Sequence, residues 1–335
     1  MRRTPRTLLG TLLATGALLA TGALAGPAGA APAPDTVHEA ARTAAAQERV
    51  RDFWTPARMR AATPLDLRTA SPNAAKSAAK SETGLGAPQT VRPTAPAASS
   101  PQADVGTLAF PQRGGPWTSG GDVVTTAGRV FFTYGGRTAS CSGNAVTSAN
   151  RSTVITAGHC VKMDGAWHTN WAFVPGYRDG QRPYGTWAAT RTLATAAWTA
   201  REDINQDVGA AVVAPLGGQR LTDVVGGQGL AFNTGYNRDM YAFGYPAAAP
   251  YDGERFIYCS GRTSRDFLLS RSHGMTCNMT GGSSGGPWFT EFNESTGRGL
   301  LSSVNSFKYN FLPNSMYGPY FGPEAQTLYQ QAQAG

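Results

Sequence analysis

The sequence is poor in charged residues and in the residues that most often bind metals. Only 15% of its 335 residues are charged, and it contains 4 Cys and 4 His. It has no C-x-x-C pair and no H-E-x-x-H motif, so the common ligand spacings of zinc sites are absent. We therefore expect neither a metal ion nor a cofactor.

A concentrated basic region is also missing, although the formal net charge is +8. Residues 1–110 contain 12 Lys and Arg against 7 Asp and Glu, which leaves 17 against 14 for residues 111–335. The resulting excess of 3 positive charges over the longer part is too small to indicate phosphate binding. Nucleic acid is therefore not expected as a partner.

Only one long apolar run occurs, and it lies at the N-terminus. The run from Leu8 to Leu24 follows three arginines and precedes the small residues Ala28 to Ala30. This order is typical of an export signal, predicted here over residues 1–30. A membrane anchor is the alternative, but Thr and Gly interrupt the run. We expect a secreted, extracellular protein without stable membrane association.

The cysteines all lie after residue 140, at Cys141, Cys160, Cys259 and Cys277. An even number of cysteines in an exported chain favours disulfides over a metal site. Three pairings are possible, and we expect the sequential one, which joins the first two cysteines and the last two.

Composition divides the rest of the chain near residue 115. Residues 37–60 have a helical pattern, whereas residues 62–105 are rich in Ala, Pro, Ser and Thr and have few large apolar side chains. We interpret residues 31–115 as a poorly structured propeptide that is partly helical and then linker-like. Residues 116–335 are predicted to form the main domain.

The main domain has the pattern of an all-β protein. Short segments rich in Val, Phe, Tyr and Thr recur between Gly, Asn and Asp turn signals, which favours one β domain or a pair of small barrels. A short helix is expected at the C-terminus, from Glu324 to Ala332. The expected strands span 129–134, 139–147, 153–157, 170–175, 185–193, 208–214, 240–245, 256–259, 287–290 and 299–306.

One serine has the surroundings of a nucleophile. Ser284 lies in the segment Gly281-Gly282-Ser283-Ser284-Gly285-Gly286, where glycines allow a tight turn that exposes a hydroxyl and aims main-chain N–H groups at one point. Acyl transfer needs this arrangement. A simple Gly/Ser turn between strands is the alternative.

A histidine and an aspartate complete a possible set. His159 ends the apolar segment Val154–Ala157, while His38, His168 and His273 lie in the N-terminal segment or in polar loops. Asp207 directly precedes the apolar run 208–213, which would draw its carboxylate into the interior, where it needs a partner.

Ser, His and Asp together can form a relay in which the imidazole activates the hydroxyl and the carboxylate orients the imidazole. Gly282-x-Ser284-x-Gly286 also matches the nucleophile turn of α/β-hydrolases, but those enzymes place Asp and His after the serine. No His or Asp follows Ser284 in this chain. The order His159, Asp207, Ser284 is that of chymotrypsin-like enzymes.

With T-A-G-H-C at 156–160, D-V-G-A-A-V-V at 207–213 and G-G-S-S-G-G-P at 281–287, residues 120–335 resemble the chymotrypsin/trypsin-like serine peptidase family. The resemblance is to its secreted bacterial branch, which includes glutamyl-endopeptidase-like members. It implies two packed six-stranded antiparallel β-barrels with the site in the cleft between them, a short C-terminal helix, and a disulfide between Cys141 and Cys160 beside the histidine.

By motif position, the resemblance makes His159 the general base, Asp207 its orienting carboxylate and Ser284 the nucleophile. The N–H groups of Gly282 and Ser284 become the oxyanion hole. The resemblance implies a monomeric secreted serine endopeptidase that acts on proteins or peptides. A catalytically silent binding relative and an esterase on the same fold are the alternatives.

The resemblance also locates a substrate pocket, lined by Asn278, Met279, Asn305 and Ser306. Asn278 stands where trypsin-like enzymes that cut after Arg or Lys have an Asp, and Asn305 stands where glutamyl peptidases have a His. We therefore expect weak selection for uncharged residues. Lys308 at the rim offers the alternative of attracting an acidic side chain.

Ser283 departs from the family pattern, because trypsin-like enzymes have at this position an Asp that pairs with a newly formed N-terminus. A neutral hydroxyl cannot anchor an ammonium group. We therefore expect that activation does not need a free N-terminus at a fixed position, while the propeptide covers the cleft or assists folding.

Overall fold

The computed structural model describes Met1 and residues 36–66, 68–69, 86–96 and 109–335. The predicted export signal lies outside these residues. The chain divides into a unit from Met1 to Ala33 and a unit from Pro34 to Gly335, and the second is described below. No helix among the described residues is long and apolar enough to cross a membrane.

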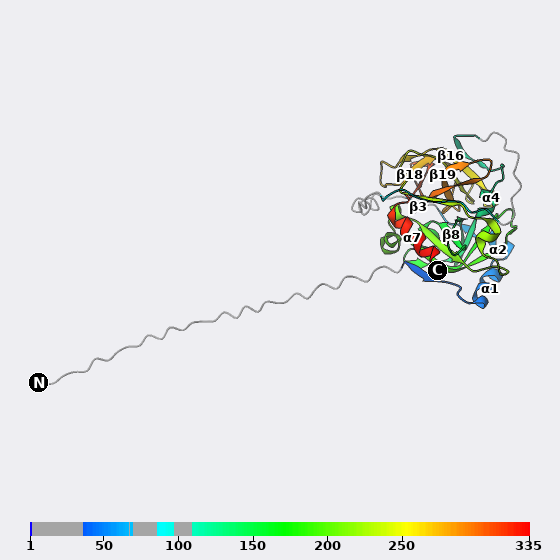
Figure 1. Cartoon of the computed structure of the whole chain (residues 1–335), viewed down its shortest axis with the longest axis horizontal. Helices are drawn as coiled ribbons and strands as arrows, with labels where there is room; N and C mark the ends of the chain where they lie inside the picture. Colours follow the sequence, from blue (N-terminus) through cyan, green and yellow to red (C-terminus); the bar gives the residue numbers. More distant parts are fainter. Residues whose placement is uncertain (2–35, 67, 70–85, 97–108) are drawn as a thin grey trace. The chain divides into compact units, whose positions relative to one another are not determined.

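The first half of the main domain closes into a six-stranded antiparallel barrel (Figure 1). Its strands pair in the order β11-β6-β7-β8-β13-β12, and β12 also pairs with β11, which completes the circle. The strands are β6 (Ala127–Tyr134), β7 (Arg137–Ala145), β8 (Thr153–Thr156), β11 (Thr169–Pro175), β12 (Trp187–Ala194) and β13 (Gly209–Val213).

The hairpin between β6 and β7 shows how the sequence directs this barrel. Gly135 and Gly136 connect the strands with φ angles of 55° and 77°, the backbone form that two-residue hairpin turns favour. The strands then place alternate side chains inside. Val130 and Phe132 of β6 pack there with Trp171 and Phe173 of β11, all with 1% exposure or less.

The second half divides its strands between two sheets. A seven-stranded sheet has the order β4-β14-β20-β19-β15-β16-β5, and a five-stranded sheet has the order β17-β18-β22-β21-β3. Figure 1 shows this half in yellow to orange around β16, β18 and β19, apart from the green half around β8. The strands are β5 (Gln112–Pro116), β14 (Gly229–Phe232), β15 (Asp239–Gly244), β16 (Ile257–Arg262), β17 (Ser264–Arg265), β18 (His273–Thr276), β19 (Pro287–Asn293), β20 (Arg298–Val304), β21 (Phe307–Tyr309) and β22 (Leu312–Gly318).

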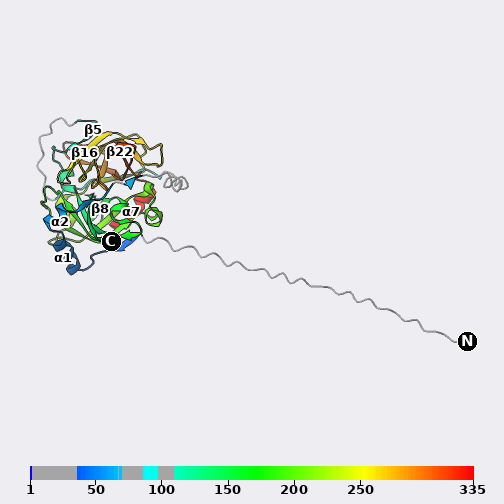
Figure 2. The same cartoon turned by 180° about the vertical axis from the view of Figure 1, so that it is seen from behind.

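Every strand expected from the sequence is present, with ends shifted by a few residues. The structure adds short strands that the composition did not indicate, among them β9 (Lys162–Met163), β10 (Ala166–Trp167) and β21. The remaining helices of the main domain are α4 (Val123–Thr126), α5 (Ala196–Arg201), α6 (Leu221–Val225) and the C-terminal α7 (Pro323–Gln333), visible in red in Figures 1 and 2. Short 3-10 turns span Gly158–Cys160 and Ile204–Gln206.

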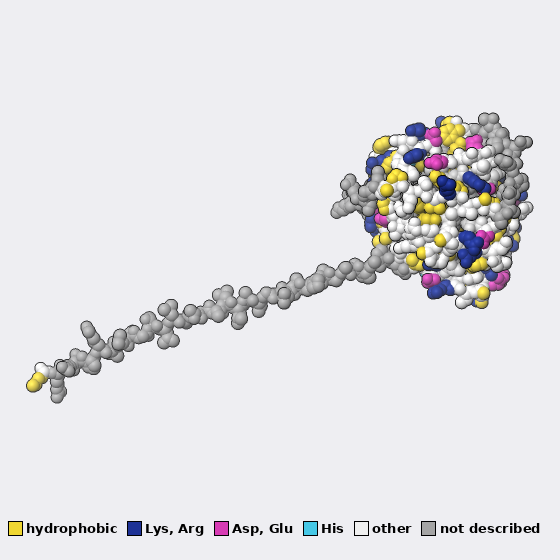
Figure 3. Space-filling view, in the orientation of Figure 1, with side chains coloured by type: hydrophobic (Ala, Val, Ile, Leu, Met, Phe, Trp, Pro, Cys, Tyr) yellow, Lys and Arg dark blue, Asp and Glu magenta, His cyan; other side chains and the backbone are white. Residues whose placement is uncertain are grey.

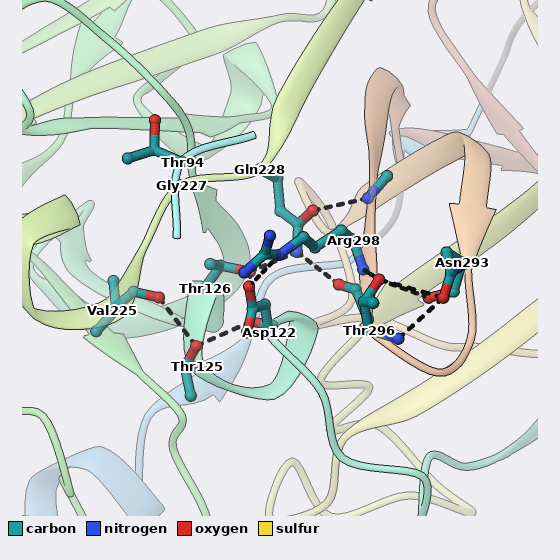
Figure 4. A network of polar contacts seen from close by, with 12 residues as sticks. Thr94, Asp122, Thr125, Thr126, Val225, Gly227, Gln228, Asn293, Thr296 and Arg298 are labelled. Carbon is teal, nitrogen blue, oxygen red and sulfur yellow. Dashed lines mark hydrogen bonds and ion pairs between the residues drawn. The ribbon is translucent and has the colours of Figure 1, made fainter. Parts of the chain in front are cut away.

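A polar network joins the two halves (Figure 4). Gln228 donates to the Thr126 hydroxyl at 3.1 Å and to the Gly297 carbonyl at 2.8 Å, and its own side-chain oxygen accepts from the Gly299 N–H. Arg298 donates to the Asp122 carboxylate at 2.6 Å. Because the Gln228 side chain is buried, these bonds fix the hairpin before β20 against the start of the first barrel.

The N-terminal segment is better packed than its composition suggests. Three elements replace the single helical stretch expected over 37–60, namely β1 (Val37–Glu39), α1 (Ala44–Phe53) and α2 (Pro56–Arg60). The helix breaks because Thr55 caps α2 by accepting from the Arg58 N–H, with Pro56 as the first helical residue.

Large side chains fasten this segment to the first barrel. Trp54 and Met59 have 0% exposure and pack in one cluster with Phe131, Val174 and Tyr177. The Trp54 indole N–H also donates to the Asn170 carbonyl at 2.6 Å. Three short strands of the segment, β2 (Thr63–Pro64), β3 (Arg68–Thr69) and β4 (Gln89–Val91), pair with β7, β21 and β14.

Basic and acidic side chains alternate on the face shown in Figure 3, with no large area of one sign.

Both expected disulfides are confirmed, Cys141 with Cys160 and Cys259 with Cys277. The second disulfide joins Cys259 of β16 to Cys277, the residue directly after β18, and so ties the seven-stranded sheet to the five-stranded sheet.

We expect the double variant Cys259→Ser/Cys277→Ser to lose about 3 kcal/mol of unfolding free energy, because the bond closes a sequence separation of 18 residues. Guanidinium unfolding of the full chain under oxidising conditions measures this loss. An unchanged midpoint would show that the two sheets do not depend on this crosslink.

Candidate active site

The histidine of the candidate site is held rigidly at the end of a barrel strand. β8 leads into the 3-10 turn that carries His159, and the next residue, Cys160, is bonded to Cys141 on β7. The Trp171 indole donates to the Cys160 carbonyl at 3.0 Å. Gly158 is required here, because a Cβ at this position would lie 2.7 Å from the Trp198 ring.

Asp207 holds this histidine through two hydrogen bonds. One carboxylate oxygen of Asp207 lies 2.7 Å from His159 Nδ1, and the other accepts from the His159 main-chain N–H at 2.8 Å. Ser306 Oγ donates to the first oxygen at 2.6 Å. Both side chains of the pair have 0% exposure.

The surroundings keep this carboxylate ionised. Burial alone would raise the pKa of Asp207, but the charge and hydrogen bonds of His159 and the Ser306 hydroxyl hold the pKa below its ordinary value. An ionised Asp207 next to Nδ1 favours the histidine form that carries its proton on Nδ1 and leaves Nε2 as a base.

Ser284 lies on a glycine-rich turn just before β19. Gly282 and Gly285 on either side have φ angles of 90° and 77°, which favour glycine. A Cβ on Gly285 would lie 2.1 Å from Thr156 Oγ1 in the first barrel. The Ser142 N–H of β7 donates to the Ser284 carbonyl at 2.7 Å, so the turn is pressed against the strand that also carries Cys141.

Two side-chain atoms in this region are buried without a hydrogen-bond partner, His159 Nε2 and Ser284 Oγ. They are the two atoms that the sequence predicts to act as base and nucleophile, and no hydrogen bond joins them in this structure. Buried polar atoms are mostly paired. Ten other buried side-chain atoms of the described residues also lack a partner, so these two stand out by their motifs and not by the missing bond alone.

The predicted oxyanion-hole N–H of Gly282 is bonded to another part of the chain. It donates at 2.9 Å to the carbonyl of Leu65, a residue of the N-terminal segment. The Gly282 carbonyl faces the other way, where it accepts from the Ser142 hydroxyl at 2.9 Å. Ser142 therefore holds the next peptide unit, between Gly282 and Ser283, a role that the sequence did not indicate.

The predicted pocket residues have different surroundings. Asn278 is exposed and accepts from the Tyr251 hydroxyl at 2.7 Å, whereas Met279 is fully buried. Asn305 is also buried, and its amide donates to the Phe243 and Ser283 carbonyls and accepts from the Trp288 indole.

Ser306, Lys308 and Ser283, in or near the predicted pocket, also form hydrogen bonds. Ser306 supports Asp207, as described above. Lys308 donates from Nζ to the Cys277 carbonyl at 2.9 Å and to the Pro313 carbonyl at 2.6 Å. Burial lowers the pKa of Lys308 to about 8. Ser283 Oγ donates to the Thr280 carbonyl at 2.7 Å.

The expectation that His168 and His273 lie in polar loops was wrong for His273, which begins a strand, whereas His168 connects β10 to β11 and is buried. His168 is 1% exposed, stacks on Phe132 with ring centres 4.3 Å apart, and lies 2.9 Å through Nε2 from the His159 carbonyl. His273 begins β18 and is 1% exposed. Flanking polar residues hid both positions, because each lies at the inward-facing place of a short strand or hairpin.

One cluster of metal-ligating atoms occurs among the described residues, formed by Cys141, His159 and Cys160. The two cysteines are joined in a disulfide, and His159 Nδ1 is bonded to Asp207. These atoms therefore do not fit a metal site.

The closed barrel, the further sheets and the buried Asp–His pair are those of a chymotrypsin-like fold. The crystal structure of the protease Anisep from Arthrobacter nicotinovorans is 45% identical, with a TM-score of 0.60, and the match covers 63% of this chain and 96% of that chain. A thermostable serine protease, AL20, from an extremophilic microorganism is 41% identical, with a TM-score of 0.60, and covers 64% of this chain and 99% of its own. The chain belongs to the chymotrypsin-like serine peptidase family.

Other comparisons are more limited. A Glu endopeptidase structure is 16% identical with a TM-score of 0.50 over 62% of this chain and 90% of its own, a likeness of fold alone. An extracellular metalloprotease of Bacillus subtilis (strain 168) is 39% identical over 79 residues, and the match spans 23% of that protein and 23% of this chain. No family model matches.

We expect the unfolding free energy of the His168→Phe variant to decrease less on acidification than that of the wild type. Burial lowers the pKa of His168 to about 4 from 6.5, so the unfolded chain binds more protons between these pH values and stability falls as the pH decreases through this window. The shift corresponds to about 3 kcal/mol, which the variant does not lose on acidification.

At neutral pH the same variant is expected to be less stable by about 1–3 kcal/mol, because the His159 carbonyl loses its partner. Denaturant unfolding of both proteins between pH 7 and pH 4 measures both effects. Parallel curves for the variant and the wild type would contradict a neutral, buried His168.

Proposed function

We propose that this protein is a secreted serine endopeptidase, made as a precursor, that cuts peptide bonds through Ser284, His159 and Asp207. The observation that carries the proposal is the buried Asp207–His159 pair at 2.7 Å, whose free nitrogen and the Ser284 hydroxyl are both left without partners. The two serine protease structures that are 45% and 41% identical support it.

In the proposed reaction, Ser284 Oγ attacks the substrate carbonyl carbon while its proton passes to His159 Nε2. Asp207 stays ionised and stabilises the imidazolium that forms. The negative charge on the carbonyl oxygen is stabilised by the N–H groups of Gly282 and Ser284. His159 then gives its proton to the leaving amine, and an acyl-enzyme remains.

Water completes the reaction by the same route. His159 accepts a proton from the water as its oxygen attacks the acyl carbon, and it returns the proton to Ser284 Oγ when the acid product leaves. The chain's own residues are sufficient for each proton transfer in this scheme.

Secretion and precursor processing are further parts of the proposal. The charged N-terminus, apolar run and small residues near position 30 support export, as do two disulfides, which persist mainly in oxidising compartments. The N-terminal segment supports a precursor, because its Leu65 carbonyl accepts from the Gly282 N–H of the glycine-rich turn. In this view the predicted propeptide, residues 31–115, is removed from the mature enzyme up to a cut before β5, because β5 pairs with β16 of the main domain.

Ser284→Ala is expected to reduce peptide hydrolysis by about a million-fold, since the nucleophile is lost while binding groups stay in place. Activity on a fluorogenic peptide after processing measures this, and mass spectrometry after treatment with a fluorophosphonate shows a single adduct in the wild type only. Ser283→Ala is the matched control, because its hydroxyl bonds the Thr280 carbonyl, and it should keep the adduct. An adduct on the Ser284→Ala variant would exclude this serine as the nucleophile.

The proposed pocket should disfavour basic residues. The Lys308 ammonium bonds the carbonyl next to Asn278, and no acidic side chain forms an ion pair with it among the described residues. We expect Lys308→Ala to raise cleavage after Arg and Lys about fivefold, which corresponds to about 1 kcal/mol of charge repulsion in water-like surroundings. A peptide library measures this ratio, and strong wild-type selection for Arg would refute the assignment.

A further inference from the structure

The candidate site is covered by the chain's own N-terminal segment. His159, Asp207 and Ser284 have no exposed surface, although a substrate must reach them. The Leu65 carbonyl accepts a hydrogen bond from the Gly282 N–H at 2.9 Å. Gly281, the residue before Gly282, also lies close to this segment, because a Cβ on Gly281 would lie 3.1 Å from both the Leu65 carbonyl and the Asp66 carboxylate.

The same segment fills a strand edge on each side of Ser284. On one side, β2 pairs with Ala139 and Ser140 of β7, and the Leu65 N–H donates to the Ser140 carbonyl at 2.9 Å. β8 pairs with β7 only at its far end, at residues 144–145, so this part of β7 is otherwise open.

On the other side, β3 pairs with Phe307 and Lys308 of β21. β3 is the last strand of its sheet, so its removal turns β21 into an open edge. Open edges on both sides of a nucleophile are places where an extended peptide can add as a strand. The segment thus occupies the positions that a substrate backbone needs.

Its direction, however, is opposite to that of a substrate. A productive peptide needs its leaving amine near His159, which is tied to β7 through the Cys160–Cys141 disulfide. Its acyl side must then extend toward β21 and the predicted pocket. A substrate therefore runs from β21 to β7, whereas the N-terminal segment pairs first with β7, through β2, and then with β21, through β3.

The segment keeps one direction on both sides of the site, because β2 runs parallel to β7 and β3 runs parallel to β21. In this orientation the nitrogen of Asp66 follows the Leu65 carbonyl toward β21 and away from His159. The peptide bond in the oxyanion hole thus lacks a proton donor for its leaving group. It blocks the site without being a substrate for it.

We propose that β2, Leu65, Asp66 and β3 act as a reverse-running inhibitory segment that binds the oxyanion hole through the Leu65 carbonyl and resists cleavage between Leu65 and Asp66; this rests on the proposed peptidase function. The anchor is the preceding helix pair, whose Trp54 and Met59 are fully buried on the first barrel. Because the segment follows this anchor directly, it competes with substrates as an intramolecular ligand at high effective concentration.

The first test is the labelling rate of Ser284 by a fluorophosphonate in the full, unprocessed chain. Leu65→Pro removes the N–H that bonds Ser140 and displaces the carbonyl from Gly282, so two hydrogen bonds are lost and labelling should accelerate about tenfold. Thr63→Ala is the matched control, because it changes an exposed side chain of the same strand and keeps its backbone bonds, and it should label at the wild-type rate.

Equal labelling of wild type and Leu65→Pro would overturn the inhibitory segment and leave the proposed function intact. Absence of labelling in every form, including the processed enzyme, would instead overturn the proposed function. Thermal unfolding of each variant shows whether the main domain is folded, and a faster rate counts only for a folded variant.

The second test separates a reverse-running segment from a substrate-like one. Mass spectrometry of the wild type and of Ser284→Ala during processing maps the bonds that are cut within residues 61–70. The proposal predicts no Ser284-dependent cut between Leu65 and Asp66. Appearance of that cut in the wild type and its loss in the variant would mean that the segment binds in the direction of a substrate.

Discussion

The structure of the site depends on one buried charge, the Asp207 carboxylate. It is expensive to bury, and it is stabilised by three donors, the two N–H groups of His159 and the Ser306 hydroxyl. Because one of these bonds comes from the His159 backbone and another from its ring, both the position and the orientation of the imidazole are fixed. The third bond comes from Ser306 in the second half of the main domain, so the same carboxylate also fixes the position of the two halves relative to each other.

The supports of the site come from both halves of the main domain. The first barrel provides His159 and Asp207 and presses Ser142 against the glycine-rich turn, while the second half provides Ser284 and Ser306. Contacts such as those of Gln228 hold the halves together away from the cleft. The N-terminal segment meets the same glycine-rich turn, where its Leu65 carbonyl accepts from the N–H of Gly282, the proposed oxyanion-hole donor.

Much of the fold follows from local sequence. The expected strands were found because alternating or continuous apolar residues between turn signals report burial directly, and the His-, Asp- and Ser-containing motifs sit at the ends of such segments. The short strands β3 and β21 have no such signal, since their pairing joins residues far apart in the chain. Trp54 and Met59 are isolated large residues in an Ala- and Arg-rich stretch, so their burial depends on a surface that only the folded barrel provides. The link from Ser306 to Asp207 is likewise a long-range contact.

The most direct measurement of the central claim is the protonation state of the His159 ring nitrogens, observed by NMR in ¹⁵N-histidine-labelled protein at neutral pH. An ionised Asp207 predicts a proton on Nδ1, with a strongly downfield ¹H resonance that disappears in Asp207→Asn as the proton moves to Nε2. A proton on Nε2 in the wild type, or an unchanged spectrum in the variant, would contradict the account.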